Sequence, residues 1–233
     1  MIAENIKPLR ERIAAKCAEF KRNPKEIRLI AVSKFFGVDT IKEANRLGIT
    51  DFGENKAQEL RDKYEILGDK VTWHFIGTLQ RNKVKYAVKS AAYIHSVDSA
   101  SLSDEINNQA GKLNKVQKIL LEVNTSFEES KSGLIDNIKV LELAKHCSTL
   151  SNVELVGLMT MAPFTDDESI IRQSFSDLRK LKDEINKIGF DLRELSMGMT
   201  NDYEIAIEEG ATMLRIGSAI FGQRDITKDW RQS

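Results

Sequence analysis

Strand-like runs alternate with helical patterns along the whole chain, and this alternation restricts the fold more than any other feature. Amphipathic patterns typical of helices include 40–47, 56–67, 134–150 and 169–188. They separate eight short runs that favour β-structure: 28–34, 51–54, 72–77, 92–97, 118–123, 154–161, 194–197 and 213–217. Strands joined by helices pair in parallel, and eight such units close into a barrel. The sequence therefore predicts an α/β fold, a single (β/α)₈ TIM-type barrel.

An extra helix is expected before the first strand. Residues 1–21 carry apolar side chains at helical spacing: Ile6, Leu9, Ile13, Cys17 and Phe20. No segment rich in Pro, Gly or Ser interrupts the 233 residues, so we expect one domain, 1–233, that ends in a C-terminal tail at 223–233. An open doubly wound sheet is the alternative, but the first strand lacks the G-x-G-x-x-G turn typical of that fold.

Charge and cysteine content narrow the class of protein. Thirty-five basic and thirty-five acidic residues cancel, so no global field favours nucleic acid or an anionic membrane. Cys17 and Cys147 lie at neither metal nor redox spacing and are expected to be buried thiols. The N-terminus carries no apolar signal segment, and no run is long enough to span a membrane. We therefore expect a cytoplasmic protein without a metal site.

Two polar residues end the first two strands, where the loops of a barrel build its functional face. Lys34 closes an apolar strand, and a charge there costs several kcal/mol unless it is paired or neutralised. A lysine that extends to the rim is the alternative. Asn55 follows the second strand and can donate and accept hydrogen bonds to a ligand. It can equally cap the helix expected at 56–67.

The last two strands carry a pattern that favours phosphate. Ser196 and Thr200 follow the seventh strand, and Gly217 and Ser218 follow the eighth. Barrels often hold phosphate at these positions with loop amides and hydroxyl groups. Ordinary turn and N-cap chemistry is the alternative interpretation.

Arg215 is predicted to face the barrel interior, because strand alternation places it on the same side as Met213. A buried guanidinium needs a partner, which is either a carboxylate, Glu54 or Glu122, or a ligand. His74 and His95 lie within strands without metal spacing, and we expect them to be hydrogen-bonded core residues. A lysine and a phosphate cradle fit either a phosphosugar enzyme or a pyridoxal-phosphate site, and residue spacing does not choose between them.

A resemblance to a known family makes that choice. The matching stretches lie at 31–34, 52–59, 73–83, 157–161, 195–203 and 211–222. In them the chain resembles the pyridoxal phosphate homeostasis protein family, relatives of the N-terminal barrel of alanine racemase. The resemblance implies pyridoxal 5′-phosphate as cofactor and roles for seven residues: Lys34 as the Schiff-base lysine, Asn55 beside the pyridine ring, Ser196 and Thr200 in the phosphate loop, Gly217 and Ser218 as the amide pair after the eighth strand, and Arg215 facing the pyridine nitrogen.

Small departures from the family pattern bear on the shape of the mouth. Thr200 and Ser218 exchange one hydroxyl residue for another, and Phe35 and Phe36 make the segment after Lys34 bulkier than usual.

The expected function follows from the arginine and from a missing base. Arginine does not readily give up a proton, so the pyridine nitrogen would stay unprotonated and the ring would be a weak electron sink. Racemases draw a tyrosine base from a second domain, and this chain ends eleven residues after Gly222. We therefore expect a non-catalytic carrier in vitamin B6 homeostasis, a monomer or weak homodimer that exchanges cofactor with apo-enzymes. A racemase-like enzyme is the main alternative, and a phosphosugar isomerase or aldolase is another.

Overall fold

The computed structural model describes residues 2–126, 128, 132–223 and 230 of the chain. The tail predicted at 223–233 therefore lies largely outside the described residues. The strands of the described part are β1 Arg28–Val32, β2 Asp51–Glu54, β3 Thr72–Phe75, β4 Tyr93–Val97, β5 Gln117–Glu122, β6 Val153–Met159, β7 Glu194–Ser196 and β8 Met213–Ile216. All pair in parallel in chain order, and β1 pairs with β8 to close the barrel. The prediction of a (β/α)₈ barrel is confirmed.

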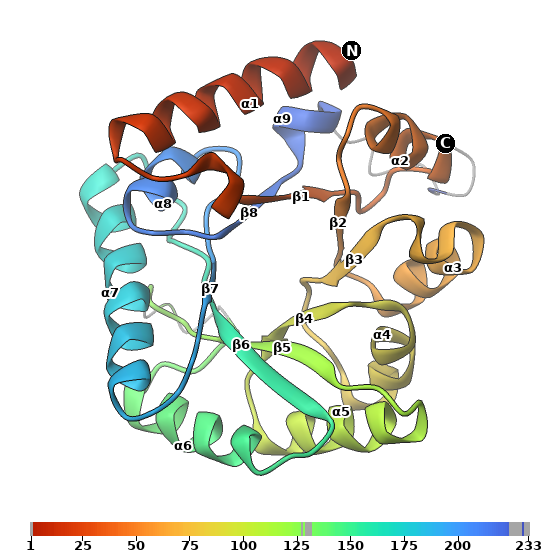
Figure 1. Cartoon of the computed structure of the whole chain (residues 1–233), viewed down its shortest axis with the longest axis vertical. Coiled ribbons are helices and arrows are strands. Elements are labelled where there is room, and N and C mark those ends of the chain that lie inside the picture. The colour runs from red at the N-terminus through yellow and green to blue at the C-terminus, as the bar shows by residue number, and fades with distance from the viewer. Residues whose placement is uncertain (1, 127, 129–131, 224–229, 231–233) are drawn as a thin grey trace.

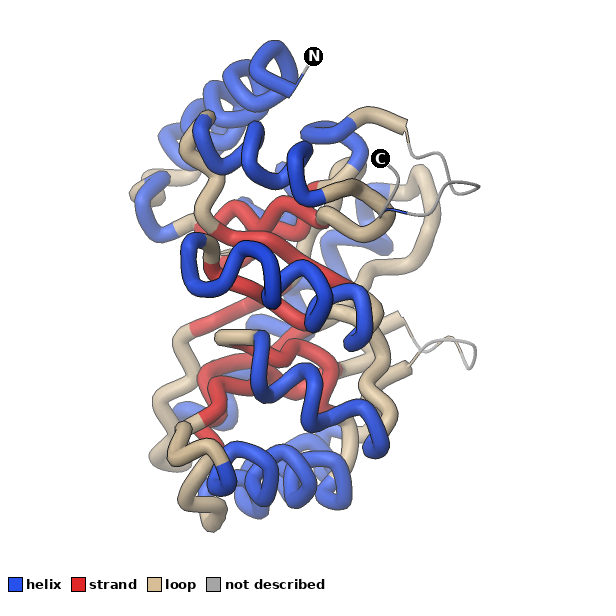
Figure 2. The backbone as a smooth tube through the Cα atoms, turned by 90° about the vertical axis from the view of Figure 1, so that its right-hand side faces the viewer, coloured by secondary structure: helices blue, strands red, loops and turns tan. Residues whose placement is uncertain are grey.

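Helices form a ring around the strands (Figures 1 and 2). They are α1 Ile2–Glu19, α2 Val38–Arg46, α3 Ala57–Leu67, α4 Val84–Ser90, α5 Ala100–Lys112, α6 Asn137–Ser148, α7 Glu168–Lys187, α8 Tyr203–Glu208 and α9 Ser218–Phe221. Short 3₁₀ turns lie at Pro24–Glu26, Gly68–Lys70 and Arg81–Lys83. The extra helix α1 packs against α8 and α9, so it covers the side of the barrel where β8 pairs with β1 (Figure 1).

The apolar stripe of α1 confirms four of the five predicted core positions. Its buried residues are Ile2, Ile6, Leu9, Ile13 and Cys17. Phe20 was expected in the same stripe, but its side chain is 42% exposed. The helix ends at Glu19 and the backbone turns through a left-handed Lys21, with φ of 55°, so the helical spacing does not continue to Phe20.

Two apolar clusters stabilise the barrel. The larger one lies between the strands and the surrounding helices and includes both cysteines, Cys17 and Cys147, which are buried free thiols as expected. The smaller one fills the interior of the barrel with side chains from five strands: Ile30, Tyr93, Leu120, Met159 and Met213. Burying apolar area stabilises the folded state by about 25 cal/mol per Å². Because these five side chains fill the interior, it is a packed core, and ligands can reach only its ends.

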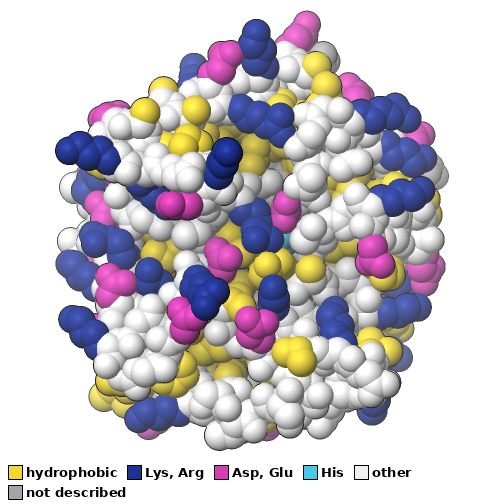
Figure 3. Space-filling model, in the orientation of Figure 1, with side chains coloured by type: hydrophobic (Ala, Val, Ile, Leu, Met, Phe, Trp, Pro, Cys, Tyr) yellow, Lys and Arg dark blue, Asp and Glu magenta, His cyan; other side chains and the backbone are white. Residues whose placement is uncertain are grey.

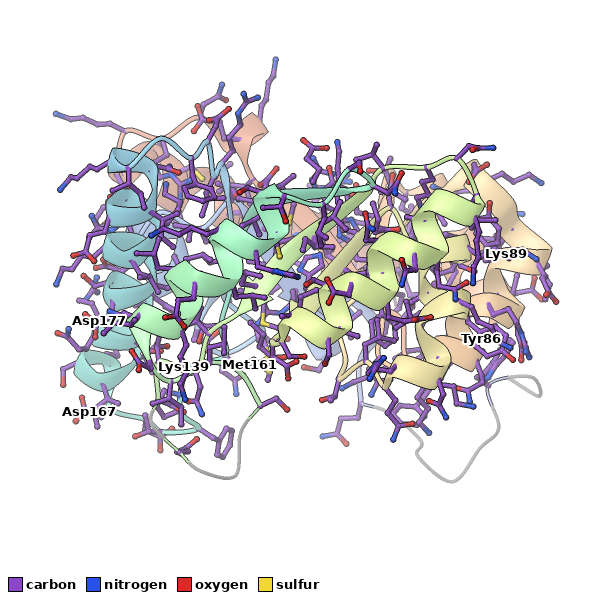
Figure 4. The ribbon with its side chains drawn as sticks, turned by 90° about the horizontal axis from the view of Figure 1, so that it is seen from below. Tyr86, Lys89, Lys139, Met161, Asp167 and Asp177 are labelled. Atoms are coloured by element: carbon purple, nitrogen blue, oxygen red, sulfur yellow. The ribbon has the colours of Figure 1, made fainter. Side chains whose placement is uncertain are left out.

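The carboxyl ends of the strands form the barrel mouth. Met161, just past the end of β6, and Asp167, at the start of α7, lie toward this same side of the molecule (Figure 4). The opposite face carries acidic and basic side chains interspersed, without a block of one sign (Figure 3). Among the described residues, no helix is long and apolar enough to cross a membrane. The described part of the chain also contains no group of three or more His, Cys, Asp or Glu that could hold a metal ion.

Candidate functional site

Lys34 lies in a tight turn that follows β1. The turn is closed by the Phe36 amide, which donates to the Ser33 carbonyl oxygen at 3.0 Å. Between them Phe35 has a left-handed backbone with φ of 71°, which is uncommon for a bulky side chain and costs of order 1–3 kcal/mol. The Phe35 amide donates to Glu59 Oε1 at 2.9 Å, which helps to hold this conformation. Lys34 itself is half-buried.

A buried cluster of charged side chains stabilises that turn. Lys63 of α3 donates from Nζ to Glu54 Oε1 at 2.7 Å, to Glu59 Oε1 at 2.7 Å and to the Ser33 carbonyl oxygen at 2.9 Å. The Ser33 hydroxyl donates to Glu54 Oε1 at 2.6 Å. We call Glu54, Glu59 and Lys63 the Lys63 cluster. Both side chains of its central pair, Lys63 and Glu54, are completely buried. The cluster bonds both to the residue before Lys34 and to the residue after it.

The Lys63 cluster holds two carboxylates for one ammonium group. Burial raises the pKa of Glu54 from 4.5 to about 7, although Lys63 opposes the shift. The second carboxyl oxygen of Glu54, Oε2, is buried without a hydrogen-bond partner among the described residues. A proton on Oε2 would bring the cluster to neutrality, which is why the raised pKa fits the geometry.

Asn55 follows β2 at the mouth, as Lys34 follows β1. The register pairs Val32 of β1 with Gly53 of β2, so Lys34 and Asn55 each lie two residues beyond a neighbouring strand position. The predicted alternative, that Asn55 caps α3, is wrong, because the residue at the cap position is Lys56 and no side chain caps this helix. Instead Asn55 Oδ1 is buried and has no hydrogen-bond partner among the described residues. Gly77 lies so close that a Cβ atom there would stand 2.3 Å from the Asn55 carbonyl oxygen.

The loops after β7 and β8 meet at Thr200. The Ser218 hydroxyl donates to Thr200 Oγ1 at 3.1 Å, and the Ala219 amide approaches the same oxygen at 3.5 Å. Gly217 stands at the start of α9, and a Cβ atom there would lie 3.5 Å from Cβ of Val32, two residues before Lys34. The structure therefore brings Thr200, Gly217 and Ser218 together at the end of β8, next to the end of β1.

Ser196 and Arg215 lie deeper in the barrel. Arg215 donates from Nη1 to Ser196 Oγ at 2.7 Å and from Nη2 to the Thr160 carbonyl oxygen at 2.8 Å. Ser196 is completely buried, so its hydroxyl group is engaged inside the barrel, whereas Thr200 and Ser218 bond to each other nearer the surface. Burial lowers the pKa of Arg215 to about 10, which leaves the guanidinium charged at neutral pH.

The carboxylate partners considered for Arg215 do not bond to it. Glu54 belongs to the Lys63 cluster, and within the described residues Glu122 forms no ion pair with Arg215. Glu122 acts on Arg215 only through its field, and burial raises the pKa of Glu122 to about 7. Arg215 therefore keeps a positive charge that the barrel solvates through neutral groups.

His74 and His95 are completely buried and hydrogen-bonded inside the barrel, as expected of core residues. Sequence reasoning missed three residues that the structure brings into the site: Glu59, Lys63 and Thr160. A signal existed for two of them, since Glu59 and Lys63 lie four residues apart on one helix, a spacing that favours ion pairs. Thr160 binds Arg215 through its backbone carbonyl, which no side-chain pattern can reveal.

The class of protein follows from a match to a known family. Residues 2–225 match the model of the alanine racemase N-terminal domain family. An alanine racemase of Clostridium difficile shares the fold with a TM-score of 0.74, at 13% identity over 94% of this chain and 61% of that one.

Nearer relatives then identify the particular family. The pyridoxal phosphate homeostasis protein of Aquifex aeolicus is 42% identical over 224 residues, which cover 95% of this chain and 97% of that one. The structure of PipY from Synechococcus elongatus with pyridoxal phosphate bound is 34% identical, covers 95% of this chain and 100% of that one, and has a TM-score of 0.83. The chain belongs to the alanine racemase N-terminal domain family and, within it, to the pyridoxal phosphate homeostasis proteins, as the resemblance predicted.

Proposed function

We propose that this protein binds pyridoxal 5′-phosphate at the barrel mouth, holds it through Lys34 and releases it by exchange, as part of intracellular vitamin B6 homeostasis. The observation that carries the proposal is the pairing of β1 with β8, which sets Val32, two residues before Lys34, against Gly217. An amine and a hydroxyl-and-amide cradle on adjacent strand ends match the two ends of this cofactor. A relative of the same fold binds the same cofactor.

The residues of the mouth fit the cofactor part by part. When bound, pyridoxal phosphate supplies an aldehyde that attaches reversibly to a primary amine. Lys34 offers that amine, and Thr200, Gly217 and Ser218 offer donors to the phosphate group. The unpartnered amide oxygen of Asn55 marks a polar position at the mouth that a donor group of the ligand could satisfy. Arg215 would supply a positive charge for the ring nitrogen, and Ser196 would contribute by holding Arg215.

We further propose that the protein is a carrier and not an enzyme. Arg215 stays charged and cannot pass a proton to the ring nitrogen at neutral pH. All four tyrosines are described, and each hydroxyl or ring contacts residues elsewhere: Tyr64 with Asp69, Tyr86 with Arg61, Tyr93 with Arg28 and Tyr203 with Glu204. Proton transfer needs a base within about 2.6–3.2 Å of the reacting proton. These contacts support the proposal that none of the four tyrosines serves as that base.

The first test concerns the attachment. Purified protein with pyridoxal phosphate should be yellow, and borohydride should fix the cofactor on the peptide that contains Lys34. Lys34→Ala should abolish this labelling, while Lys56→Ala, at an exposed lysine nearby, should keep it. Label found on Lys56 in the parent protein would contradict the assignment, and label on Lys131 would do the same, although that residue lies outside the described part. A phosphosugar enzyme of the same fold would show no cofactor colour.

The second test separates carrier from enzyme. Holo-protein mixed with an apo pyridoxal-phosphate enzyme should restore its activity in the presence of a trap for free cofactor. Turnover of common amino acids by racemisation, transamination or decarboxylation should be negligible. Robust turnover that Lys34→Ala abolishes would overturn the carrier proposal and favour the racemase-like alternative. The cytoplasmic location, the oligomeric state and the identity of the acceptor enzymes stay predictions.

The third test concerns the phosphate. Pyridoxal should bind far more weakly than its phosphate, because charge-assisted hydrogen bonds to phosphate oxygens are strong. The double variant Thr200→Ala/Ser218→Ala should narrow this difference by about a hundredfold, since each lost hydrogen bond to a charged group contributes roughly 1.5–3 kcal/mol, and the loop amides that remain should preserve part of it. Thr149→Ala/Ser148→Ala, at the far end of α6, serves as the control. Equal affinity of the parent protein for pyridoxal and its phosphate would contradict the cradle.

A further inference from the structure

An unbroken line of hydrogen bonds crosses the barrel interior. Asp51 Oδ1 lies 2.9 Å from His74 Nε2, and His74 Nδ1 lies 2.9 Å from His95 Nε2. His95 Nδ1 lies 2.9 Å from Ser196 Oγ, which accepts from Arg215 at 2.7 Å. The five residues come from β2, β3, β4, β7 and β8, and Asp51 begins its strand whereas Ser196 ends its own. The line therefore runs from the amino ends of the strands toward the mouth.

The chemistry of the two ends sets the direction of every bond. Arginine can only donate, so Ser196 Oγ accepts from Arg215 and its single proton is available to His95 Nδ1. An ionised carboxylate can only accept, so His74 Nε2 carries a proton that it donates to Asp51. Between them His95 Nε2 donates to His74 Nδ1. Each ring then carries one proton, on Nε2, and each of the four ring nitrogens has one hydrogen-bond partner in the line. Asp51 Oδ1 also accepts from Arg28 Nη1 at 3.5 Å.

The protonation states required by this direction agree with the environment. Burial lowers the pKa of His74, and burial lowers the pKa of His95 well below 6.5, so both rings are neutral at neutral pH. Burial raises the pKa of Asp51, but hydrogen bonds from His74 and Thr50 outweigh it and bring that pKa below its usual value. The carboxylate at the far end is thus ionised.

The line determines how Arg215 is held. Two guanidinium nitrogens bond to two separate acceptors, Ser196 Oγ and the Thr160 carbonyl oxygen, and two such bonds define the plane of the group. The carbonyl is rigid because it belongs to the backbone. The hydroxyl is rigid only if something holds its proton away from Arg215, and His95 Nδ1 does so at 2.9 Å. Without that acceptor, the hydroxyl group rotates and the second bond of Arg215 weakens.

We propose that His74 and His95 are positioning residues for the bound cofactor, which act through the Ser196 hydroxyl to fix the guanidinium plane of Arg215 at the floor of the mouth. The inference rests on the function proposed above and deepens it, because it assigns a role in cofactor recognition to side chains that do not reach the mouth. Residues that merely fill the interior would affect stability, whereas positioning residues affect cofactor binding through one particular hydroxyl group.

A double-mutant cycle between His95 and Ser196 tests this role. His95→Phe keeps a ring but removes both nitrogens, and Ser196→Ala removes the hydroxyl. Each variant should weaken binding of pyridoxal phosphate by about tenfold, the effect of one hydrogen bond to a charged group. Because both act on the same bond of Arg215, the double variant should bind no more weakly than the weaker single variant. Independent effects, which multiply to about a hundredfold, would overturn the proposal.

A second substitution at position 95 shows whether the hydrogen-bond acceptor, and not the ring, is what matters for binding. The amide oxygen of asparagine can take the place of Nδ1, so His95→Asn can still accept from Ser196 and should regain most of the affinity lost in His95→Phe. His146→Phe, at a half-exposed histidine on α6, and Ser90→Ala, at a buried hydroxyl on α4, are the matched controls and should bind as the parent does. If His95→Phe fails to fold, His95→Gln replaces it in the cycle, because the glutamine amide reaches the position of Nε2 toward His74 and leaves the Ser196 hydroxyl without its acceptor; it should weaken binding only when that hydroxyl is present.

Two failures can be told apart. A parent protein that does not bind pyridoxal phosphate refutes the proposed function and the inference with it. A parent that binds it, together with His95→Phe at unchanged affinity or His95→Asn no better than His95→Phe, refutes the inference alone.

Discussion

Two buried cations lie at the end of this barrel, and the protein treats them differently. Lys63 is surrounded by two carboxylates at 2.7 Å, so its charge is more than balanced by the protein. Arg215 is equally buried, yet its two hydrogen bonds go to a hydroxyl group and a backbone carbonyl. Glu122 and Asp202 act on it only through their fields.

This difference in hydrogen-bond partners distinguishes a charge that stabilises the fold from a charge that is available to a ligand. A buried charge removed from its partners is strongly destabilising, so a fully paired cation is part of the framework. A cation held by neutral groups keeps its field for an incoming group, at the expense of some stability. Lys63 supports the turn that carries Lys34, and Arg215 is the cation that we propose for the cofactor. Substitutions at each site should therefore give opposite patterns of stability and binding.

The largest effect is expected at Lys63. Lys63→Met leaves two carboxylates buried without their cation, and the free energy of unfolding of the apo-protein should fall by about 3–5 kcal/mol. Urea denaturation measures the loss, which should be similar with and without pyridoxal phosphate. Lys56→Met, at an exposed lysine just before the same helix, should change the stability by less than about 0.5 kcal/mol. A loss at Lys63 as small as that of the control would show that the cluster does not support the framework.

Arg215 should show the reverse pattern. Arg215→Gln keeps a donor for Ser196 but removes the charge, so affinity for pyridoxal phosphate should fall roughly 10- to 100-fold, as expected for a hydrogen bond to a charged group. The free energy of unfolding of the apo-protein should change by less than about 2 kcal/mol. Absorbance titration and urea denaturation check the two quantities. An apo-protein that unfolds on this substitution, with normal binding in any folded fraction, would make Arg215 a framework residue like Lys63.

The smallest effect is a pH dependence at Glu54. Its pKa is raised from 4.5 to about 7, so the folded protein binds a proton that the unfolded chain releases. This contribution to stability is fully present below pH 4.5 and is lost as the pH rises through 7. Glu54→Gln mimics the protonated form at every pH. Its free energy of unfolding relative to that of the parent should therefore rise between pH 5 and pH 8, by about 1–3 kcal/mol.

Denaturation at several pH values measures the Glu54 effect as a difference between variant and parent. The difference is needed because burial also raises the pKa of Glu122 to about 7. A difference that stays flat with pH would show that Glu54 is ionised in the cluster, and a difference that falls would reverse the sign derived from its burial.

The fold could be predicted from the sequence because each strand and helix has a local residue pattern of its own. Every predicted strand is found within three residues of its expected ends, since apolar runs and glycine positions are local signals. Phe20 failed because the helix stops one residue earlier through a left-handed Lys21. The ends of elements depend on backbone conformations that helical periodicity does not describe.

The site was predictable only in part. The sequence predicted that Lys34, Asn55, Thr200 and Ser218 follow strand ends at one face of the barrel, because parallel strands carry their carboxyl ends to one face, and the structure places them there. Their roles toward the cofactor stay predictions. The partners of Arg215 were not predictable. Alternation showed that its side chain points inward, but the choice of Ser196 and Thr160 over Glu54 depends on how far each strand is staggered along the barrel. This stagger is a property of the closed barrel, so it cannot be predicted from the residues of any single strand.

Gly77 has no functional group, yet any substitution at this position would disturb the mouth. A Cβ atom there would stand 2.3 Å from the carbonyl oxygen of Asn55 and 2.8 Å from its Cα, so even alanine would push the end of β2 aside. The obstacle is backbone, which cannot rotate out of the way as a long side chain can. In a library that randomises position 77 and selects for cofactor retention, glycine alone should survive, so this position should tolerate as little change as Lys34, the lysine proposed to hold the cofactor.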